Sequence, residues 1–120
     1  MKKTWENYLG NMVGVLLMYN LIYSDSFVKS LDEIIYNWES ELGFSEEKIK
    51  VFVQSIEHSL RMVSEFPKMH EEVSDIYSLN SPTYRILIGK QYAIFYRINS
   101  KNKEILVVSI FNQKQMRIEF

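Results

Sequence analysis

Two arginines within strand-like sequence are the residues best placed to do chemistry. Residues 83–89 read TYRILIG and residues 92–98 read YAIFYRI, and both runs are rich in the Ile, Tyr and Phe that strands favour. Because side chains alternate between the two faces of a strand, Arg85 and Arg97 each share a face with apolar neighbours. Burying an unpaired charge is costly. The arginines therefore lie either at solvated positions of a half-exposed sheet or on a basic surface for a phosphate or carboxylate ligand.

The two histidines are the candidate acid–base groups, because histidine titrates near neutral pH. His58 falls among polar neighbours in a predicted helix, which favours a solvated surface role. His70 follows Pro67 in a long connection. If that connection folds over the face that carries the arginines, His70 becomes a candidate general acid or base.

The sequence carries no standard catalytic signature. It has no Gly-rich phosphate loop, no HExxH and no GxSxG. The absence of cysteine excludes disulfides, zinc–thiolate sites and thiol nucleophiles. We interpret Glu71, Glu72 and Asp75 as a solvated acidic loop rather than as metal ligands. We therefore expect no metal and no cofactor.

Two amphipathic helices must position these groups. Ser24 or Asp25 caps the first helix and Gly43 ends it, while Ser45 caps the second and Pro67 ends it. The first apolar stripe comprises Phe27, Leu31, Ile34, Ile35, Trp38 and Leu42. The second comprises Ile49, Phe52, Val53, Ile56, Leu60 and Val63. The short connection between them predicts an antiparallel helical hairpin that needs an apolar surface to cover.

Strands flank this hairpin on both sides in the chain. A short strand is predicted at 19–23, and three strands at 83–89, 92–98 and 104–112, with 68–82 as the longest irregular connection. The order is strand, helix, helix, then three antiparallel strands. It predicts one α+β domain over residues 18–120, with the helical hairpin on one face of a small sheet.

Residues 1–17 form an N-terminal extension that carries a helical apolar pattern. The pattern consists of Trp5, Tyr8, Leu9, Met12, Val13, Leu16 and Leu17. Gly10 and Gly14 weaken such a helix by roughly 1 kcal/mol each. An alternative is that Met18 is the natural start and that residues 1–17 are a poorly packed extension.

A secretory signal is a further interpretation of the extension, since Lys2 and Lys3 precede an apolar run. Asn11 and Asn20 interrupt that run, and no small-residue cleavage site follows it. The run is also too short and too broken to cross a bilayer. We therefore expect a cytoplasmic protein with no membrane partner.

Charge is distributed unevenly along the chain. Residues 1–82 carry 7 Lys/Arg and 13 Asp/Glu, whereas residues 83–120 carry 7 Lys/Arg and 2 Asp/Glu, so the two parts differ in sign although the whole chain carries −1. The positive part could attract an anionic partner to the sheet. The alternative is that the two parts neutralise each other in the folded protein.

The second half of the chain resembles the RelE/ParE superfamily of toxins from bacterial type II toxin–antitoxin systems, the plasmid-stabilisation type. The resemblance rests on Leu79, on the pair Tyr84-Arg85, on the run 92–96 (YAIFY) and on the Val/Ile-rich run 105–110. Upstream, IYSDSFVKSLDEIIYNW resembles the first strand and helix of that superfamily. The resemblance covers roughly residues 19–116 and leaves residues 1–17 outside it.

The resemblance also implies site residues. Arg85 matches a widely shared basic position, and Arg97 follows the strand tyrosine as in ParE-like members. RelE-like members often carry arginine where this chain has Leu87 and Ala93. A histidine frequent after their last strand is replaced here by Asn112, with Lys114 two residues on.

Three functions are compatible with this resemblance. The first, which we prefer, is a ParE-like toxin that poisons DNA gyrase and is not a nuclease. The second is a RelE-like, ribosome-dependent mRNA endoribonuclease, in which Arg85, Arg97 and Lys114 stabilise phosphate charge and His70 is a further candidate. The third is a non-toxic relic or regulatory module that keeps the fold and binds only an antitoxin.

The resemblance implies a small acidic antitoxin as partner. The residues expected to meet the antitoxin or the target are Arg85, Arg97, Asn112, Lys114 and Arg117. A basic sheet and tail would give such a partner a surface of complementary charge.

Overall fold

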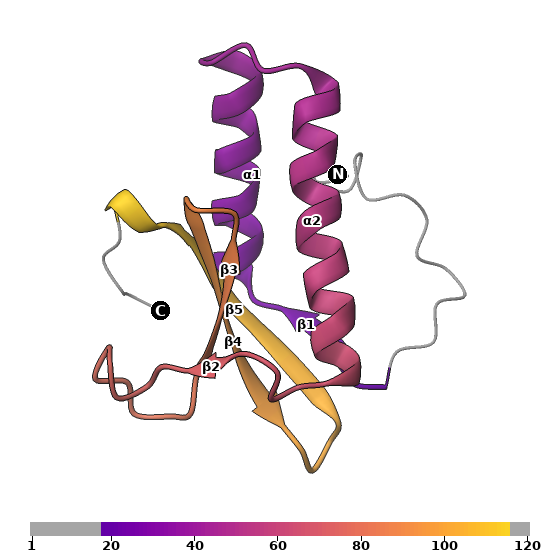
Figure 1. The fold of residues 1–120 in the computed structure, drawn as a ribbon, viewed down its shortest axis with the longest axis vertical. Coiled ribbons are helices and arrows are strands. Elements are labelled where there is room, and N and C mark those ends of the chain that lie inside the picture. The colour runs from indigo at the N-terminus through magenta and orange to yellow at the C-terminus, as the bar shows by residue number, and fades with distance from the viewer. Residues whose placement is uncertain (1–17, 116–120) are drawn as a thin grey trace.

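A computed structural model of the protein describes residues 18–115, which form two helices against one face of a five-stranded sheet (Figure 1). The elements are β1 (Asn20–Tyr23), α1 (Asp25–Ser40), α2 (Glu46–Glu65), β2 (Glu71–Glu72), β3 (Tyr84–Ile88), β4 (Tyr92–Asn99), β5 (Glu104–Asn112) and the single 3₁₀ turn η2 (Gln113–Gln115). The predicted α+β class and the predicted order of elements are confirmed.

The strands lie in the order β1-β5-β4-β3-β2. The three long strands β3, β4 and β5 pair antiparallel, as predicted. β1 lies parallel to β5 at one edge, with Leu21 opposite Ile105, because the helical hairpin carries the chain back across the sheet. At the other edge the two-residue strand β2 pairs antiparallel with β3. The sequence did not predict β2, which lies within the connection that we expected to be irregular.

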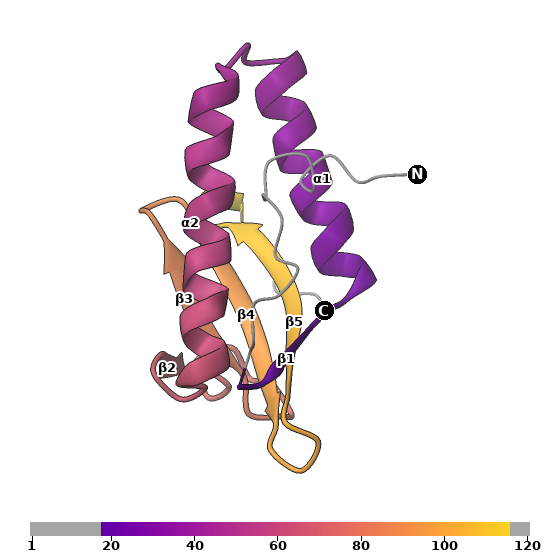
Figure 2. The ribbon, with the colours of Figure 1, turned by 90° about the vertical axis from the view of Figure 1, so that its right-hand side faces the viewer.

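The main core lies between the helical hairpin and one face of the sheet, and Figure 2 shows the two helices on that side. All six residues of the predicted stripe on α2 are buried. On α1, Phe27, Leu31 and Ile35 are buried, and Ile34 and Trp38 pack at the border of the core. Leu42 is an error in the predicted stripe, because α1 ends at Ser40 and Leu42 is exposed in the turn that follows.

Ser24 joins the first helix to the sheet. Its side-chain oxygen accepts a hydrogen bond from the backbone N–H of Phe27 at 3.0 Å, which caps α1, and its hydroxyl donates to the carbonyl of Val108. Its own N–H donates to the carbonyl of Val107 at 3.0 Å. Ser45 caps α2 in the same manner, with Lys48 N–H as donor at 3.1 Å, but this cap is exposed. Both predicted caps are therefore present, and only that of Ser24 also contacts the sheet.

Two sequence-based predictions concern residues that the structure does not describe. The helical stripe of the N-terminal extension lies in residues 1–17, and Arg117 lies in the tail at 116–120. Among residues 18–115, no helix is long and apolar enough to cross a membrane.

The two caps provide a matched test of this arrangement. Replacing Ser24 or Ser45 by Ala removes a helix cap in each case, which costs about 1 kcal/mol of stability. We expect Ser24→Ala to lower the free energy of unfolding by roughly 2 kcal/mol, because it also leaves the Val108 carbonyl without its hydroxyl donor. Urea denaturation measures both values, and equal losses in the two variants would contradict the proposed link to the sheet.

Candidate functional site

Arg85 and Arg97 lie on the same face of the sheet, the face turned away from the helices. Arg85 on β3 is opposite Phe95 on β4, and Arg97 follows two residues later on β4, opposite Leu106 on β5. The two arginines are thus diagonal neighbours across adjacent strands. The structure therefore brings together the two residues that the sequence singled out first.

That face is not open to solvent at its centre. A second apolar cluster lies there, in which Val73, Ala93 and Phe95 are fully buried and Tyr77 and Phe111 pack at the border. The Tyr77 and Phe111 rings both meet the Phe95 ring edge-on, with centroids 5.5 and 5.9 Å away.

The cover of this cluster is the connection between α2 and β3. Its Val73 N–H donates to the Thr83 carbonyl at 2.7 Å, and its Tyr77 N–H donates to the Val73 carbonyl at 3.2 Å. We call residues 73–83 the cover loop. The sequence contains a signal for this second cluster that our prediction missed. Strand alternation places the apolar side chains of Ala93, Phe95 and Phe111 on the face away from the helices, which therefore needs a cover.

Arg85 fastens the cover loop to the sheet. Its Nη1 donates to the Tyr77 hydroxyl at 2.9 Å, and its Nη2 lies 3.4 Å from the Glu71 carboxylate. The Arg85 side chain is only 20% exposed, whereas that of Glu71 is 58% exposed, so the ion pair itself adds little stability. The guanidinium is therefore held in a fixed orientation at the border of the second cluster.

Arg97 contacts the other end of the cover loop. Its Nε donates to the Thr83 hydroxyl at 3.1 Å, and that hydroxyl donates to the Ser81 carbonyl at 2.9 Å. Beside Arg97, a shallow hollow of about 220 Å³ is bordered by Ile22 on β1 and Leu106 on β5. Arg97 thus lies between the cover loop and an accessible, partly apolar edge.

His70 does not join the arginines. Its ring meets the Tyr96 ring edge-on at 6.3 Å, and Tyr96 belongs to the main core on the helix side of the sheet. The connection does fold over the arginine face, as the hypothesis for His70 required. However, β2 begins at Glu71, whose partner is Arg85, so the preceding residue falls on the opposite side.

Partial burial lowers the pKa of His70. Nearby, the Tyr96 hydroxyl donates to the Pro67 carbonyl at 2.6 Å, and burial raises the pKa of this phenol. The His70 ring and the Tyr96 hydroxyl therefore lie at the end of α2 on the helix side of the sheet, away from the two arginines.

Asn112 and Lys114 lie in a different place, where β5 ends beside α1. The Asn112 side-chain oxygen accepts from the backbone N–H of Lys114 at 3.0 Å, which starts the η2 turn. Asn112 is paired with Tyr92, and Tyr92 accepts a hydrogen bond from Trp38 Nε1 at 3.2 Å. Apart from His70, the predicted site residues that the structure describes thus fall into two groups, one on the arginine face and one at the end of β5.

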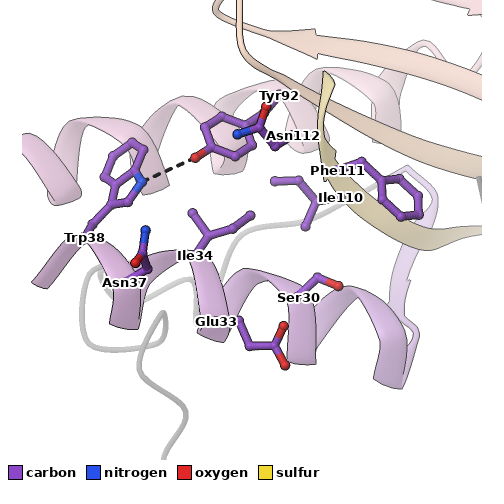
Figure 3. A pocket seen from close by; sticks show the side chains of 9 residues that line it. All are labelled: Ser30, Glu33, Ile34, Asn37, Trp38, Tyr92, Ile110, Phe111 and Asn112. Atoms are coloured by element: carbon purple, nitrogen blue, oxygen red, sulfur yellow. Dashed lines mark hydrogen bonds between the residues drawn. The ribbon is translucent and has the colours of Figure 1, made fainter. Parts of the chain in front are cut away.

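Asn112, from the second group, borders a groove of about 290 Å³ between α1 and the end of β5 (Figure 3). The lining residues are Ser30, Glu33, Ile34, Asn37, Trp38, Tyr92, Ile110, Phe111 and Asn112. Figure 3 shows Ile34 and Ile110 facing each other across the groove, with Asn37 and Glu33 along the helix side. The groove combines apolar side chains, such as Ile34 and Ile110, with polar ones, such as Asn37 and Asn112, which suits an amphipathic protein segment.

The positive charge of the second half is spread out rather than concentrated on the sheet. Lys90 lies in the turn between β3 and β4, and Lys101 and Lys103 lie in the turn at the opposite end of β4. Within residues 83–115, only Arg85 and Arg97 come from the strands. Lys90, Lys101 and Lys103 thus lie where the chain reverses direction and not on the strands.

Glu71 and Glu72, the acidic residues of β2, each contact a different polar partner. Glu71 faces Arg85, and Glu72 accepts a hydrogen bond from the Ser74 hydroxyl. Within the part of the chain that the structure describes, no three His, Cys, Asp or Glu side chains gather closely enough to hold a metal ion.

Comparison with families of known sequences shows to which family the chain belongs. Residues 21–117 match the family described as the ParE toxin of the type II toxin-antitoxin system, parDE. This match spans most of the chain, so the protein belongs to the ParE toxin family. The resemblance to the RelE/ParE superfamily is thereby confirmed. No curated protein sequence matches the chain.

Solved structures agree on the fold. The chromosomal ParDE toxin–antitoxin system from P. aeruginosa contains a chain with 18% identity and a TM-score of 0.61, and the alignment covers 79% of this chain and 96% of that one. The archaeal RelE-RelB complex from Pyrococcus horikoshii OT3 contains a chain with 13% identity and a TM-score of 0.53, aligned over 83% of this chain and 100% of that one. At these identities the similarity establishes the fold.

The lowered pKa of His70 has a consequence for stability. Between this pKa and the usual value of about 6.5, the unfolded chain binds more protons than the folded one. The free energy of unfolding should therefore fall as the pH drops below 6.5 and level off below the pKa of the folded state. His70→Gln should make the dependence of the free energy of unfolding on pH shallower. Urea titrations between about pH 5 and 7.5, roughly the range over which histidine titrates, measure this dependence. His58→Gln, at an exposed position of α2, is the control, and an unchanged slope in His70→Gln would refute the assignment.

Proposed function

We propose that this protein is a toxin that arrests growth by binding DNA gyrase, and that a cognate antitoxin neutralises it. Membership of the ParE toxin family supports the toxin part of the proposal. The choice of a protein target over RNA rests on the second apolar cluster. Phe95 and Ala93 occupy the centre of the arginine face, where an RNA-cleaving member of the superfamily would need polar groups around the scissile phosphate.

The side chains that remain exposed around the second apolar cluster also favour a protein target. Leu87 is 52% exposed on the same face as Arg85, and Ile76 in the cover loop is 59% exposed. Exposed apolar side chains beside an oriented guanidinium are typical of protein-binding surfaces, in which arginine and large apolar residues supply most of the affinity. We therefore assign target contact to the cover loop and the arginines that hold it.

The second candidate is a ribosome-dependent mRNA endoribonuclease. It is favoured by the placement of Arg85 and Arg97 as diagonal neighbours, since two guanidiniums could stabilise one phosphate. Against it, His70 lies on the other side of the sheet and Glu71 faces Arg85. In the described part of the chain, this leaves the arginine face without a histidine to act as acid or base.

We propose that the antitoxin lies in the groove between α1 and the end of β5. The P. aeruginosa and P. horikoshii relatives were solved as a ParDE system and a RelE-RelB complex, which supports a protein partner. Trp38 and Ile34 offer apolar contacts, and the exposed Lys114 offers a positive charge beside Asn112. An acidic, amphipathic antitoxin segment fits this combination.

The gyrase proposal predicts a specific biochemical defect. The purified protein should inhibit DNA supercoiling by gyrase, and Arg85→Ala should reduce that inhibition by at least about tenfold, since removing one well-placed arginine at an interface costs on the order of 2 kcal/mol. Arg85→Lys keeps the charge but not the two-pronged geometry and should rescue only part of the inhibition.

Circular dichroism and thermal melting provide the control for this test. Arg85→Ala should keep the helical signal, because the main core does not involve Arg85. A folded Arg85→Ala protein that still inhibits gyrase fully would show that the assigned target surface is wrong. Codon-specific mRNA cleavage by the unmodified protein would favour the second candidate instead.

The antitoxin proposal predicts opposite effects from two charge reversals at the groove. Lys114→Glu should slow association with the cognate antitoxin, and Glu33→Lys should accelerate it, each by a factor of about two to ten, with both differences shrinking at high salt. Stopped-flow or surface-based kinetics at two salt concentrations measure these rates. Identical association rates for the two variants would place the antitoxin elsewhere.

A further inference from the structure

The outer edge of β3 is covered by β2 over only part of its length. In the order of strands β2 lies outside β3, and it pairs with Tyr84 and Arg85 alone. Before β2 the chain turns away, since the Met69 N–H donates to the Phe66 carbonyl at 3.1 Å. Within residues 18–115, no further strand lies alongside residues 86–88 on that side.

The hydrogen bonds beside β2 show which backbone groups of β3 face this open edge. The Val73 N–H donates to the Thr83 carbonyl at 2.7 Å, so the backbone groups of Thr83 face the outer side. In an antiparallel ladder these groups alternate between the two sides of a strand from one residue to the next. Arg85 and Leu87 therefore also face outward. Because β2 begins at Glu71, opposite Arg85, the N–H and C=O of Leu87 point beyond the end of β2.

This part of the edge lacks the usual protection of an exposed strand. Natural proteins protect exposed edges with charged side chains, proline or bulges. Residues 86–88 read ILI and contain none of these features. Ile86 and Ile88 are buried in the main core, whereas the Leu87 side chain lies on the arginine face and is 52% exposed. The edge thus presents backbone groups and an apolar side chain together, the combination that an added strand requires.

We propose that an extended segment of the target protein pairs with this edge as an added strand, antiparallel to β3. The inference rests on the proposed function, in which the target is gyrase, and specifies how the two proteins touch. Such a segment places an apolar side chain against Leu87, on the same face as Arg85. It begins near Lys90, which is exposed in the turn after β3, so an acidic residue at its start is favoured.

A second copy of the chain fits the edge less well. Two β3 strands paired around Leu87 would bring Gly89 of one copy opposite Arg85 of the other. Glu71 already occupies that place in each copy, so the pairing would be confined to residues 86–88. Three residues a side bury far less than the roughly 800 Å² per partner of a stable interface. A different protein can leave the edge after Leu87 and continue across the arginine face.

Hydrogen exchange of the unmodified full chain, with and without purified DNA gyrase, tests the added strand directly. Mass spectrometry that resolves single amides measures the rates. Gyrase should slow exchange of the Leu87 amide at least about tenfold, if the bound state outweighs the unbound state about tenfold. The Ile86 amide, which faces β4, should exchange slowly in both samples. The Lys101 amide, in the turn at the other end of β4, should exchange rapidly in both.

Two substitutions at Leu87 separate the backbone from the side chain. Leu87→Ala keeps the outward N–H, whereas Leu87→Pro removes it without removing a hydrogen bond to β4. Leu87→Pro should inhibit gyrase about two- to tenfold less than Leu87→Ala, the loss expected for one hydrogen bond. Lys90→Glu should also weaken inhibition, and Lys101→Glu is its matched control. Thermal melting confirms that each variant is folded.

The outcomes separate this inference from the proposed function. Slowed exchange at Leu87, together with weaker inhibition by Leu87→Pro, supports the added strand. Inhibition of gyrase with an unchanged Leu87 exchange rate overturns the added strand and leaves the gyrase proposal standing, as does equal inhibition by folded Leu87→Pro and Leu87→Ala. If Leu87→Pro does not fold, the exchange measurement on the unmodified chain decides. No inhibition by the unmodified chain would overturn both proposals.

Discussion

The burial of β4 on both of its faces is the constraint on which the rest of the structure depends. Ile94 and Tyr96 point into the main core under the helical hairpin, while Ala93 and Phe95 point into the second cluster under the cover loop. An antiparallel sheet in a small domain commonly leaves one face to solvent. Here the run of five buried residues from Tyr92 to Tyr96 requires a cover on each side, and the connection after α2 supplies the second one. The same connection also holds both strand arginines in position, because each arginine is hydrogen-bonded to one of its residues.

Most of the fold could be predicted from the sequence, because local rules determine it. The stripe on α2, the caps at Ser24 and Ser45 and the three long strands follow from periodicity and from side-chain chemistry close by in the chain. The partner of β1 and the existence of β2 could not be predicted in this way. A two-residue strand such as Glu71–Glu72 has no periodicity of its own and forms only because the edge of β3 accepts it. Leu42 was misplaced for a related reason, since its spacing fits the stripe although the helix ends before it.

The candidate site was predicted less completely than the fold. The sequence placed Arg85 and Arg97 in strands beside apolar neighbours, but that they share one face follows only from the strand pairing. Their hydrogen-bond partners Tyr77 and Thr83 come from a segment whose path the sequence did not specify. Residue type alone suggested His70 as a catalytic group, whereas strand alternation next to β2 puts it against Tyr96. The guanidiniums thus have two roles at once, because they hold the cover loop and present charge beside exposed apolar side chains. This dual role links the stability of the loop to the proposed binding of a protein target.

The central claim is that the arginine face acts on a protein and not on RNA. The most direct test induces the protein in a bacterial host and, within minutes, maps new RNA 5′ ends together with covalent gyrase–DNA complexes in the same culture. We predict an increase in gyrase–DNA complexes with no new 5′ ends inside translated codons. New ends within codons and no increase in gyrase–DNA complexes would contradict the claim, because they would require the face around Phe95 to open and admit RNA.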